Sequence, residues 1–307
     1  MARIRADLSL LLAAFIWGTA FIAQKMAVGS MGPLLFLGCR FLLSTLLLAP
    51  MAWAESRRRT DALTAPDWRL ALMVGASLFV GMAGQQIGIV STTTTNAGFL
   101  TAIYVVLVPV VAWVLHRSKA KLVVLASCAI SLAGAWMLEQ GGEGQPWGFG
   151  DVMILASDIF QALQIILVER FLARHSRPLL LSFLQYAVIT LVAFPLAFAF
   201  ETVSLRGIVD AGPSILYAGL LSGGVAFTLQ IVAQRHTPAA EAAIIMSLES
   251  VFAALAGAWL MGDRLGIAGY IGCGFILAGV MLVQLVPLLR RRNPLEPSVT
   301  PPQDASP

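Results

Sequence analysis

Long apolar segments separated by short polar loops run through the chain. The segments hold about 20 mostly apolar residues each, the length that a helix needs to cross a bilayer. None shows the strict alternation of apolar and polar residues that is typical of a membrane barrel strand. The pattern therefore predicts an all-α integral membrane protein. Its ten expected transmembrane helices lie at residues 8–27, 33–53, 69–90, 95–115, 120–138, 150–170, 179–200, 212–234, 240–261 and 266–287.

The pattern occurs twice, because a shift of about 145 residues aligns the second half of the chain with the first. Residues that match at this shift include Gln85 with Gln230, Thr92 with Thr237, Cys128 with Cys273 and Pro50 with Pro195. Each half has five spans, an odd number, so the second half enters the membrane from the opposite side. We expect two inverted five-helix repeats, at residues 1–145 and 146–290, as in secondary transporters. Residues 291–307 are expected to form a disordered cytoplasmic tail.

Composition supports a membrane protein, since 58% of the residues are hydrophobic and 12% are charged. A soluble domain is roughly a quarter charged. The net charge of +4 would suggest a nucleic-acid partner in a soluble protein. Here sixteen of the 20 Lys and Arg residues fall on one side of the predicted membrane topology. The positive-inside rule then places both termini in the cytoplasm and explains the charge without nucleic acid.

Chemistry of the usual enzyme classes is missing from the sequence. There is no phosphate-binding GxxxxGK[ST] loop and no HExxH zinc motif. The three cysteines, Cys39, Cys128 and Cys273, lie in apolar segments without metal-ligand spacing. We therefore expect no cofactor, no metal and no enzymatic activity.

Three charged residues fall well inside predicted spans, namely Arg40, Asp158 and Glu249. Such charges cost roughly 2.5–3.5 kcal/mol on insertion scales and usually have a reason. Glu249 lies near the middle of the ninth span, where burial opposes the charged form of a carboxylate. It either takes up and releases a proton, contacts substrate, or serves as the fixed counterion of Arg40. We favour the structural ion pair over the coupling role.

Arg40 has a planar guanidinium that suits a substrate carboxylate or phosphate, or an ion pair with Asp158 or Glu249. The ion pair is again the favoured interpretation. Asp158, Gln161 and Gln164 follow at helical spacing, so they share one face of the sixth span. That face lines either a cavity or a helix contact.

A further polar set lies in the third, fourth and eighth spans. Gln85 and Gln230 are repeat partners, and Tyr104 occupies the repeat position of Glu249. Amides in such places either orient the polar groups of a ligand or join helices by hydrogen bonds. The expected substrate-binding or coupling residues are thus Glu249, Arg40, Asp158, Gln85, Gln230, Asn96, Tyr104, Trp17 and Gln161. For Trp17, near mid-membrane, packing is favoured over stacking on a substrate.

Several local motifs resemble the EamA-type ten-helix branch of the drug/metabolite transporter superfamily. They are Trp17-Gly18 with Phe21 and Lys25, Pro33 with Arg40-Phe41, and Ser247-Leu248-Glu249-Ser250-Val251. The last differs from the family's usual LEPV by Ser250, and Gly262-Asp263 stands where the family has G-E. The resemblance implies a transporter that moves small metabolites or drugs across the inner membrane by exchange or proton coupling.

Together these features predict a secondary transporter that exports a small metabolite or drug-like compound through a central cavity with alternating access. Its expected partners are a small-molecule substrate and membrane lipid, and a homodimer is an open possibility. Two alternatives are an intramembrane enzyme acting on a lipid-linked substrate and a non-transporting membrane sensor. The enzyme would need a convergent acid/base or metal set, and the sensor an attached soluble domain.

Overall fold

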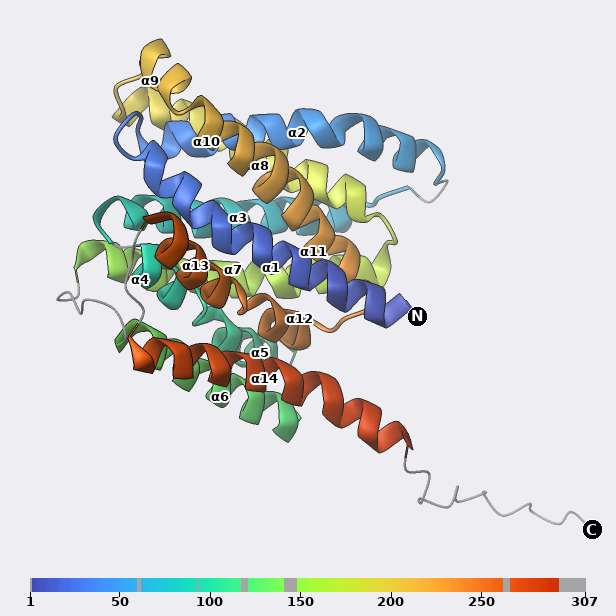
Figure 1. The fold of residues 1–307 in the computed structure, drawn as a ribbon. Helices are drawn as coiled ribbons and strands as arrows, with labels where there is room; N and C mark the ends of the chain where they lie inside the picture. Colours follow the sequence, from blue (N-terminus) through green and yellow to red (C-terminus); the bar gives the residue numbers. More distant parts are fainter. Residues whose placement is uncertain are drawn as a thin grey trace, which may run out of the picture.

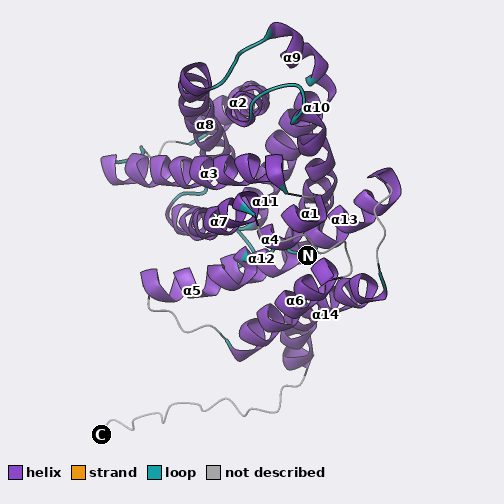
Figure 2. Cartoon of the chain, turned by 90° about the vertical axis from the view of Figure 1, so that its left-hand side faces the viewer, coloured by secondary structure: helices purple, strands orange, loops and turns teal. Residues whose placement is uncertain are grey.

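The computed structural model describes residues 2–59, 62–92, 94–116, 121–140, 148–261 and 266–292. These residues form helices and no strands (Figures 1 and 2). In chain order the elements are α1 Ala2–Ala27, α2 Pro33–Arg57, α3 Ala65–Ser91, α4 Thr94–Thr101, α5 Tyr104–His116, α6 Leu122–Gln140, α7 Phe149–Arg174, α8 Pro178–Phe200, α9 Leu205–Asp210, α10 Gly212–Leu216, the π-helical η1 Tyr217–Ala226, α11 Phe227–Ala233, α12 Ala239–Met246, α13 Glu249–Ala256, the π-helical η2 Gly257–Met261, and α14 Ile267–Arg292.

Eight helical stretches of the described chain are long and apolar enough to cross a membrane, and two shorter apolar helices lie at Leu122–Met137 and Ile267–Val283. Together they account for the ten predicted spans. Large apolar side chains such as Leu122 and Trp259 are exposed, whereas Arg40 and Asp158 are buried. This inverts the pattern of a soluble protein and fits a protein surrounded by lipid. The predicted tail from residue 293 onward lies outside the described residues, and α14 continues through residues 291 and 292.

The two halves meet through reciprocal contacts. The Glu55 carboxylate accepts a hydrogen bond from the Leu180 backbone at 2.8 Å, at the start of α8. Glu201 accepts from the Leu34 and Leu35 backbones, also at 2.8 Å, at the start of α2. Each carboxylate satisfies the free N–H groups at the start of the partner helix.

The α6–α14 pair shows the same reciprocity at one end of the bundle, with α2 and α8 at the other (Figures 1 and 2). A Cβ on Gly134 would meet the backbone of Gly272 and Ile276. A Cβ on Gly279 would meet Ser127 and Ser131, which are their counterparts at the 145-residue shift. These small residues let the repeat-related helices approach closely.

Three of the predicted spans are found as membrane-length helical stretches that depart locally from regular α-helix. The fourth is divided into α4 and α5, and the ninth into α12 and α13. The two breaks lie at repeat-equivalent positions and contain hydrogen bonds between residues three apart. The Ile103 N–H donates to the Leu100 carbonyl, and the Leu248 N–H donates to the Ile245 carbonyl. The eighth span passes through the π-helical η1. Because π segments and paired broken helices often mark functional sites, these interruptions locate the region of interest.

Candidate functional site

A cavity lies at the broken helices and is lined by both halves of the chain. Its empty volume is about 480 Å³, including space open to solvent. The lining residues are Trp17, Phe21 and Gln24 of α1, Arg40 of α2, Leu78, Met82 and Gln85 of α3, Tyr104 of α5, Gln161, Gln164 and Ile165 of α7, Ser222 of η1, Phe227 and Gln230 of α11, Met246 of α12, and Glu249 of α13. Seven of the nine predicted site residues are among them.

The other two predicted residues are not part of the described lining. The Asn96 side chain lies outside the described residues. Asp158 is fully buried, but it does not line the cavity, and neither of its carboxylate oxygens has a hydrogen-bond partner. Of the predicted polar face on α7, only Gln161 and Gln164 line the cavity. Asp158 lies one turn before Gln161, nearer the start of the helix.

The favoured ion pair of Arg40 with Glu249 or Asp158 is wrong. No carboxylate of the described chain lies within 4.0 Å of the Arg40 guanidinium. Arg40 instead donates to the Gln24 amide oxygen at 2.9 Å and to the Met82 sulfur at 3.6 Å. Helical spacing predicts which face a charge occupies, but not how far it lies from a charge on another helix.

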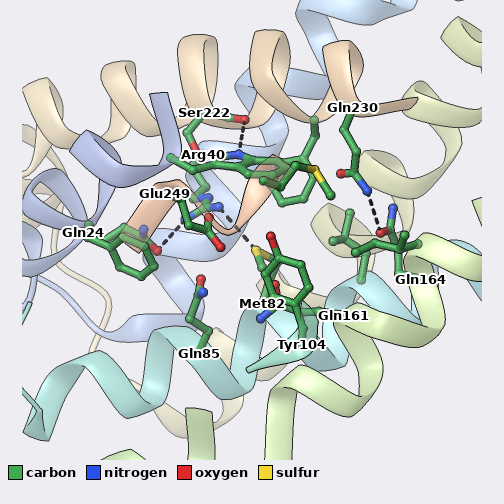
Figure 3. A pocket seen from close by; sticks show the side chains of 16 residues that line it. Gln24, Arg40, Met82, Gln85, Tyr104, Gln161, Gln164, Ser222, Gln230 and Glu249 are labelled. Atoms are coloured by element: carbon green, nitrogen blue, oxygen red, sulfur yellow. Dashed lines mark hydrogen bonds between the residues drawn. The ribbon is translucent and has the colours of Figure 1, made fainter. Parts of the chain in front are cut away.

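Glu249 and Tyr104 begin the second half-helices α13 and α5 at repeat-equivalent positions. Both side chains line the cavity together with Arg40 (Figure 3). The Tyr104 hydroxyl and the Glu249 carboxylate lie close enough to interact with each other. Beyond that contact, the hydroxyl and one carboxylate oxygen make no hydrogen bond within the described chain. The cavity therefore holds a cation, a carboxylate and a phenol whose hydrogen bonds to the described residues are incomplete.

Buried amides form a second part of the site. The Gln164 amide donates to the Gln185 oxygen at 3.1 Å, and Gln230 donates to the Gln164 oxygen at 3.2 Å. Gln85 donates to the Thr101 hydroxyl at 3.0 Å. The predicted glutamines thus serve as interhelical bonds and also line the cavity, with the Gln230 oxygen and the Gln161 amide nitrogen left without partners.

Aromatic rings close the apolar side of the cavity. The Trp17 indole donates to the Ser222 carbonyl at 3.3 Å, and its ring centroid lies 4.6 Å from that of Phe227. The favoured packing role of Trp17 agrees with these contacts, although one of its faces also lines the cavity.

Sequence reasoning missed Gln24, Met82, Ser222 and Phe227 as lining residues. Gln24 had a usable signal, because Trp17, Phe21 and Gln24 recur at helical spacing and all three line the cavity. No sequence signal indicated Ser222 or Phe227, because the π-helical η1 changes which side chains face inward.

Matched hydrogen bonds lie at the two ends of the cavity helices. The Thr237 hydroxyl donates to the Asp7 carboxylate at 2.9 Å, before α12. Its repeat partner Thr92 donates to Asp151 at 2.6 Å, before α4. Lys25 donates to the Thr92 carbonyl at 2.7 Å, so Thr92 lies beside the far end of α1. Asp7 and Lys25 are about 27 Å apart along that helix, at about 1.5 Å per residue.

The end near Asp7 carries additional bonds. Arg3 pairs with both Asp7 and Glu241, and the Glu169 carboxylate accepts from the Ala239 backbone at 3.2 Å. These contacts join α1 and α7 to the start of α12, the half-helix that leads to Glu249. In this structure, hydrogen bonds therefore join the two repeats at both ends of α1.

Comparison with known proteins gives one consistent family. The profile of the EamA-like transporter family matches residues 4–139 and again residues 148–285. An uncharacterized transporter of Archaeoglobus fulgidus is 31% identical over 283 residues, which cover 92% of this chain and 87% of the relative. The uncharacterized inner membrane transporter YedA of Escherichia coli K12 is 28% identical over 300 residues, covering 95% and 94%.

A solved crystal structure has the same fold at 18% sequence identity. Its TM-score is 0.74, and the match covers 94% of this chain and 98% of that one. The two family matches together span nearly all of the described chain, and the matches with the two relatives cover most of their lengths. The protein is a multi-pass membrane protein that belongs to the EamA-like transporter family.

Proposed function

We propose that the protein is a secondary transporter that exports a small metabolite or drug-like compound through the central cavity. The observation that carries this proposal is the cavity itself, which both repeats line at their broken helices. It contains Arg40 and Glu249, neither of which has a counterion among the described residues. Transporters with inverted repeats bind substrates at such places.

Coupling to protons, or exchange of one solute for another, supplies the driving force in this proposal. Glu249 supports proton coupling because it is 4% exposed and belongs to no ion pair within the described chain. Burial opposes the charged form of a carboxylate, and a carboxylate that no cation fixes is free to take up and release a proton. A permanent counterion would have opposed this role.

Alternating access would proceed by breaking the Thr237–Asp7 and Thr92–Asp151 bonds in turn. Each bond ties the start of a half-helix to the other repeat. Because the bonds lie at opposite ends of α1, releasing one opens the cavity toward one side of the membrane while the other keeps it closed. The repeat symmetry supports this mechanism, since inverted halves exchange conformations when the protein changes sides.

The proposed location is the inner membrane, with both termini in the cytoplasm. The distribution of Lys and Arg supports the orientation, and the name of the Escherichia coli relative supports the location. The partners are the substrate and the surrounding lipid, without nucleic acid, and a homodimer is the alternative to a monomer. Enzymatic activity has no part in the proposal.

The test is a ligand screen followed by counterflow. The protein purified in detergent is heated with a metabolite panel at two pH values, because a ligand of the folded state raises the melting temperature. Compounds that stabilise the protein are then tested for exchange in proteoliposomes. Accumulation of labelled compound against preloaded unlabelled compound supports transport. Chemical conversion of the compound, or binding without any exchange, supports the intramembrane enzyme or the sensor instead.

A further inference from the structure

Arg40 is a buried cation whose hydrogen bonds are incomplete. The residue is 2% exposed and lies two turns into α2. One terminal nitrogen donates to the neutral amide of Gln24, the other meets only the Met82 sulfur, and Nε has no partner. The Phe41 ring lies 4.8 Å from the guanidinium carbon. A guanidinium has five donor hydrogens, and sulfur is a weak acceptor, so an anionic acceptor is missing from this site.

The neighbouring helices hold the backbones beside Arg40 and Glu249 in place. Ser44, one turn after Arg40, donates to the Gly219 carbonyl of η1 at 2.7 Å. A Cβ on Gly18 would lie 2.7 Å from the Glu249 carbonyl, so α1 and α13 are in close contact. These contacts hold α2 against η1 and α1 against α13, and no carboxylate of the described chain pairs with the guanidinium.

The rest of the cavity suits an apolar or aromatic body. Trp17, Phe21 and Phe227 supply rings, and Leu78 and Met246 supply aliphatic surface. Polar atoms without partners are limited to a few directions, among them the Gln161 amide nitrogen and the Gln230 oxygen. Ligand sites typically combine such apolar walls with a small number of polar groups that fix orientation.

We propose that Arg40 binds a carboxylate of the substrate, so that the cavity selects organic carboxylates with an apolar or aromatic body. This inference rests on the proposed transport function and names its substrate class. The planar guanidinium and the carboxylate form two parallel hydrogen bonds. Nε and one terminal nitrogen are available for them, since Nε is free and the sulfur contact is readily displaced.

The experiment compares matched carboxylates and amides on the full-length protein in detergent. Pairs such as phenylacetate with phenylacetamide, indole-3-acetate with indole-3-acetamide, and hexanoate with hexanamide differ in charge but little in shape. Melting temperature and calorimetric affinity are measured at one pH. We expect carboxylates to bind and their amides to bind about ten- to hundredfold more weakly, the effect of a hydrogen-bonded charge.

Variants of Arg40 provide the second part of the experiment. Arg40→Gln is expected to remove the preference for carboxylates, and Arg40→Lys to keep the charge but lower affinity because the planar fork is lost. Arg206→Gln is the matched control, because Arg206 lies on α9 with a side chain that is 91% exposed. If Arg40→Gln does not fold, the comparison of carboxylates with amides on the unaltered protein still decides the question.

Three results would overturn the inference: equal binding of acids and amides, unaltered carboxylate affinity in Arg40→Gln, or no binding of any carboxylate in the panel. Counterflow separates this failure from failure of the proposed function. Exchange of amides or amines without carboxylates would refute the substrate class and leave the transporter intact. Binding of carboxylates without counterflow would support the Arg40 site and refute transport.

Discussion

At the residue scale, the cavity is defined by charged and polar side chains that the protein does not satisfy itself. Within the described chain Arg40 pairs with no carboxylate and Glu249 with no cation, and the Tyr104 hydroxyl has only Glu249 as a neighbouring polar group. Buried polar groups are normally hydrogen-bonded, and exceptions in a native structure call for an explanation. Alternate binding of a substrate and a proton at this site would explain these groups.

Glu249→Gln tests whether the carboxylate couples transport to protons. Glutamine keeps the size and polarity of the side chain but cannot ionise, so we predict that counterflow of a bound ligand persists and loses its dependence on pH. Counterflow is measured in proteoliposomes over a series of pH values on both sides of neutrality. A wild-type pH profile in the variant would show that Glu249 is not the coupling group.

At the element scale, small residues bring the cavity helices into direct contact. A Cβ on Gly18 of α1 would lie 2.5 Å from the Phe252 Cβ and 2.8 Å from the Ala253 nitrogen of α13. Such a methyl group forces the helices apart. Overpacking of this kind typically costs about 1–3 kcal/mol.

We predict that Gly18→Ala lowers the melting temperature of the purified protein and weakens ligand binding, because α13 carries Glu249. Gly274→Ala is the control, since a Cβ there meets nothing within 4 Å and the position is also helical. Alanine at Gly274 should be neutral or slightly stabilising. Equal melting temperatures for the two variants would contradict the close packing of α1 on α13.

The two repeat-related threonines allow a paired test of alternating access. Thr237→Val and Thr92→Val each remove one hydroxyl and keep the shape of the side chain. A single cavity cysteine, Ser222→Cys in a background without Cys39, Cys128 and Cys273, reports access through a membrane-impermeant thiol reagent. We predict faster labelling from the cytoplasmic side in Thr237→Val and faster labelling from the outside in Thr92→Val.

Labelling that rises on the same side in both variants would contradict the assignment of the two bonds to opposite ends. Faster labelling from the outside in Thr237→Val and from the cytoplasm in Thr92→Val would support the paired mechanism but refute cytoplasmic termini. The Arg3–Glu241 pair also joins α1 to α12 near Thr237, so this end remains partly held in Thr237→Val.

At the scale of the whole molecule, the sequence predicts more of the architecture than of the site. The apolar segments and the 145-residue repeat follow from composition and from matches such as Gln85 with Gln230, and the structure contains the corresponding helices. The breaks at residues 102–103 and 247–248 were not predicted from the sequence, because neither contains the Gly or Pro that usually marks the end of a helix.

Side chains were predictable only as far as the face of their own helix. Gln161 and Gln164 line the cavity, one of the two alternatives for that face, while Asp158 on the same face is buried and does not line it. The missing Arg40 ion pair depends on the distance between helices, which packing sets. No single-helix pattern contains that distance.

The central claim is that this cavity carries a solute across the membrane, and counterflow in proteoliposomes tests it most directly. The labelled compound should be one that raises the melting temperature of the purified protein, with Arg206→Gln as a positive control and protein-free vesicles as a blank. We predict that labelled compound accumulates transiently in wild-type vesicles and that this accumulation is markedly reduced in Arg40→Gln vesicles. Stabilising ligands that bind at the cavity yet never exchange across the membrane would contradict it.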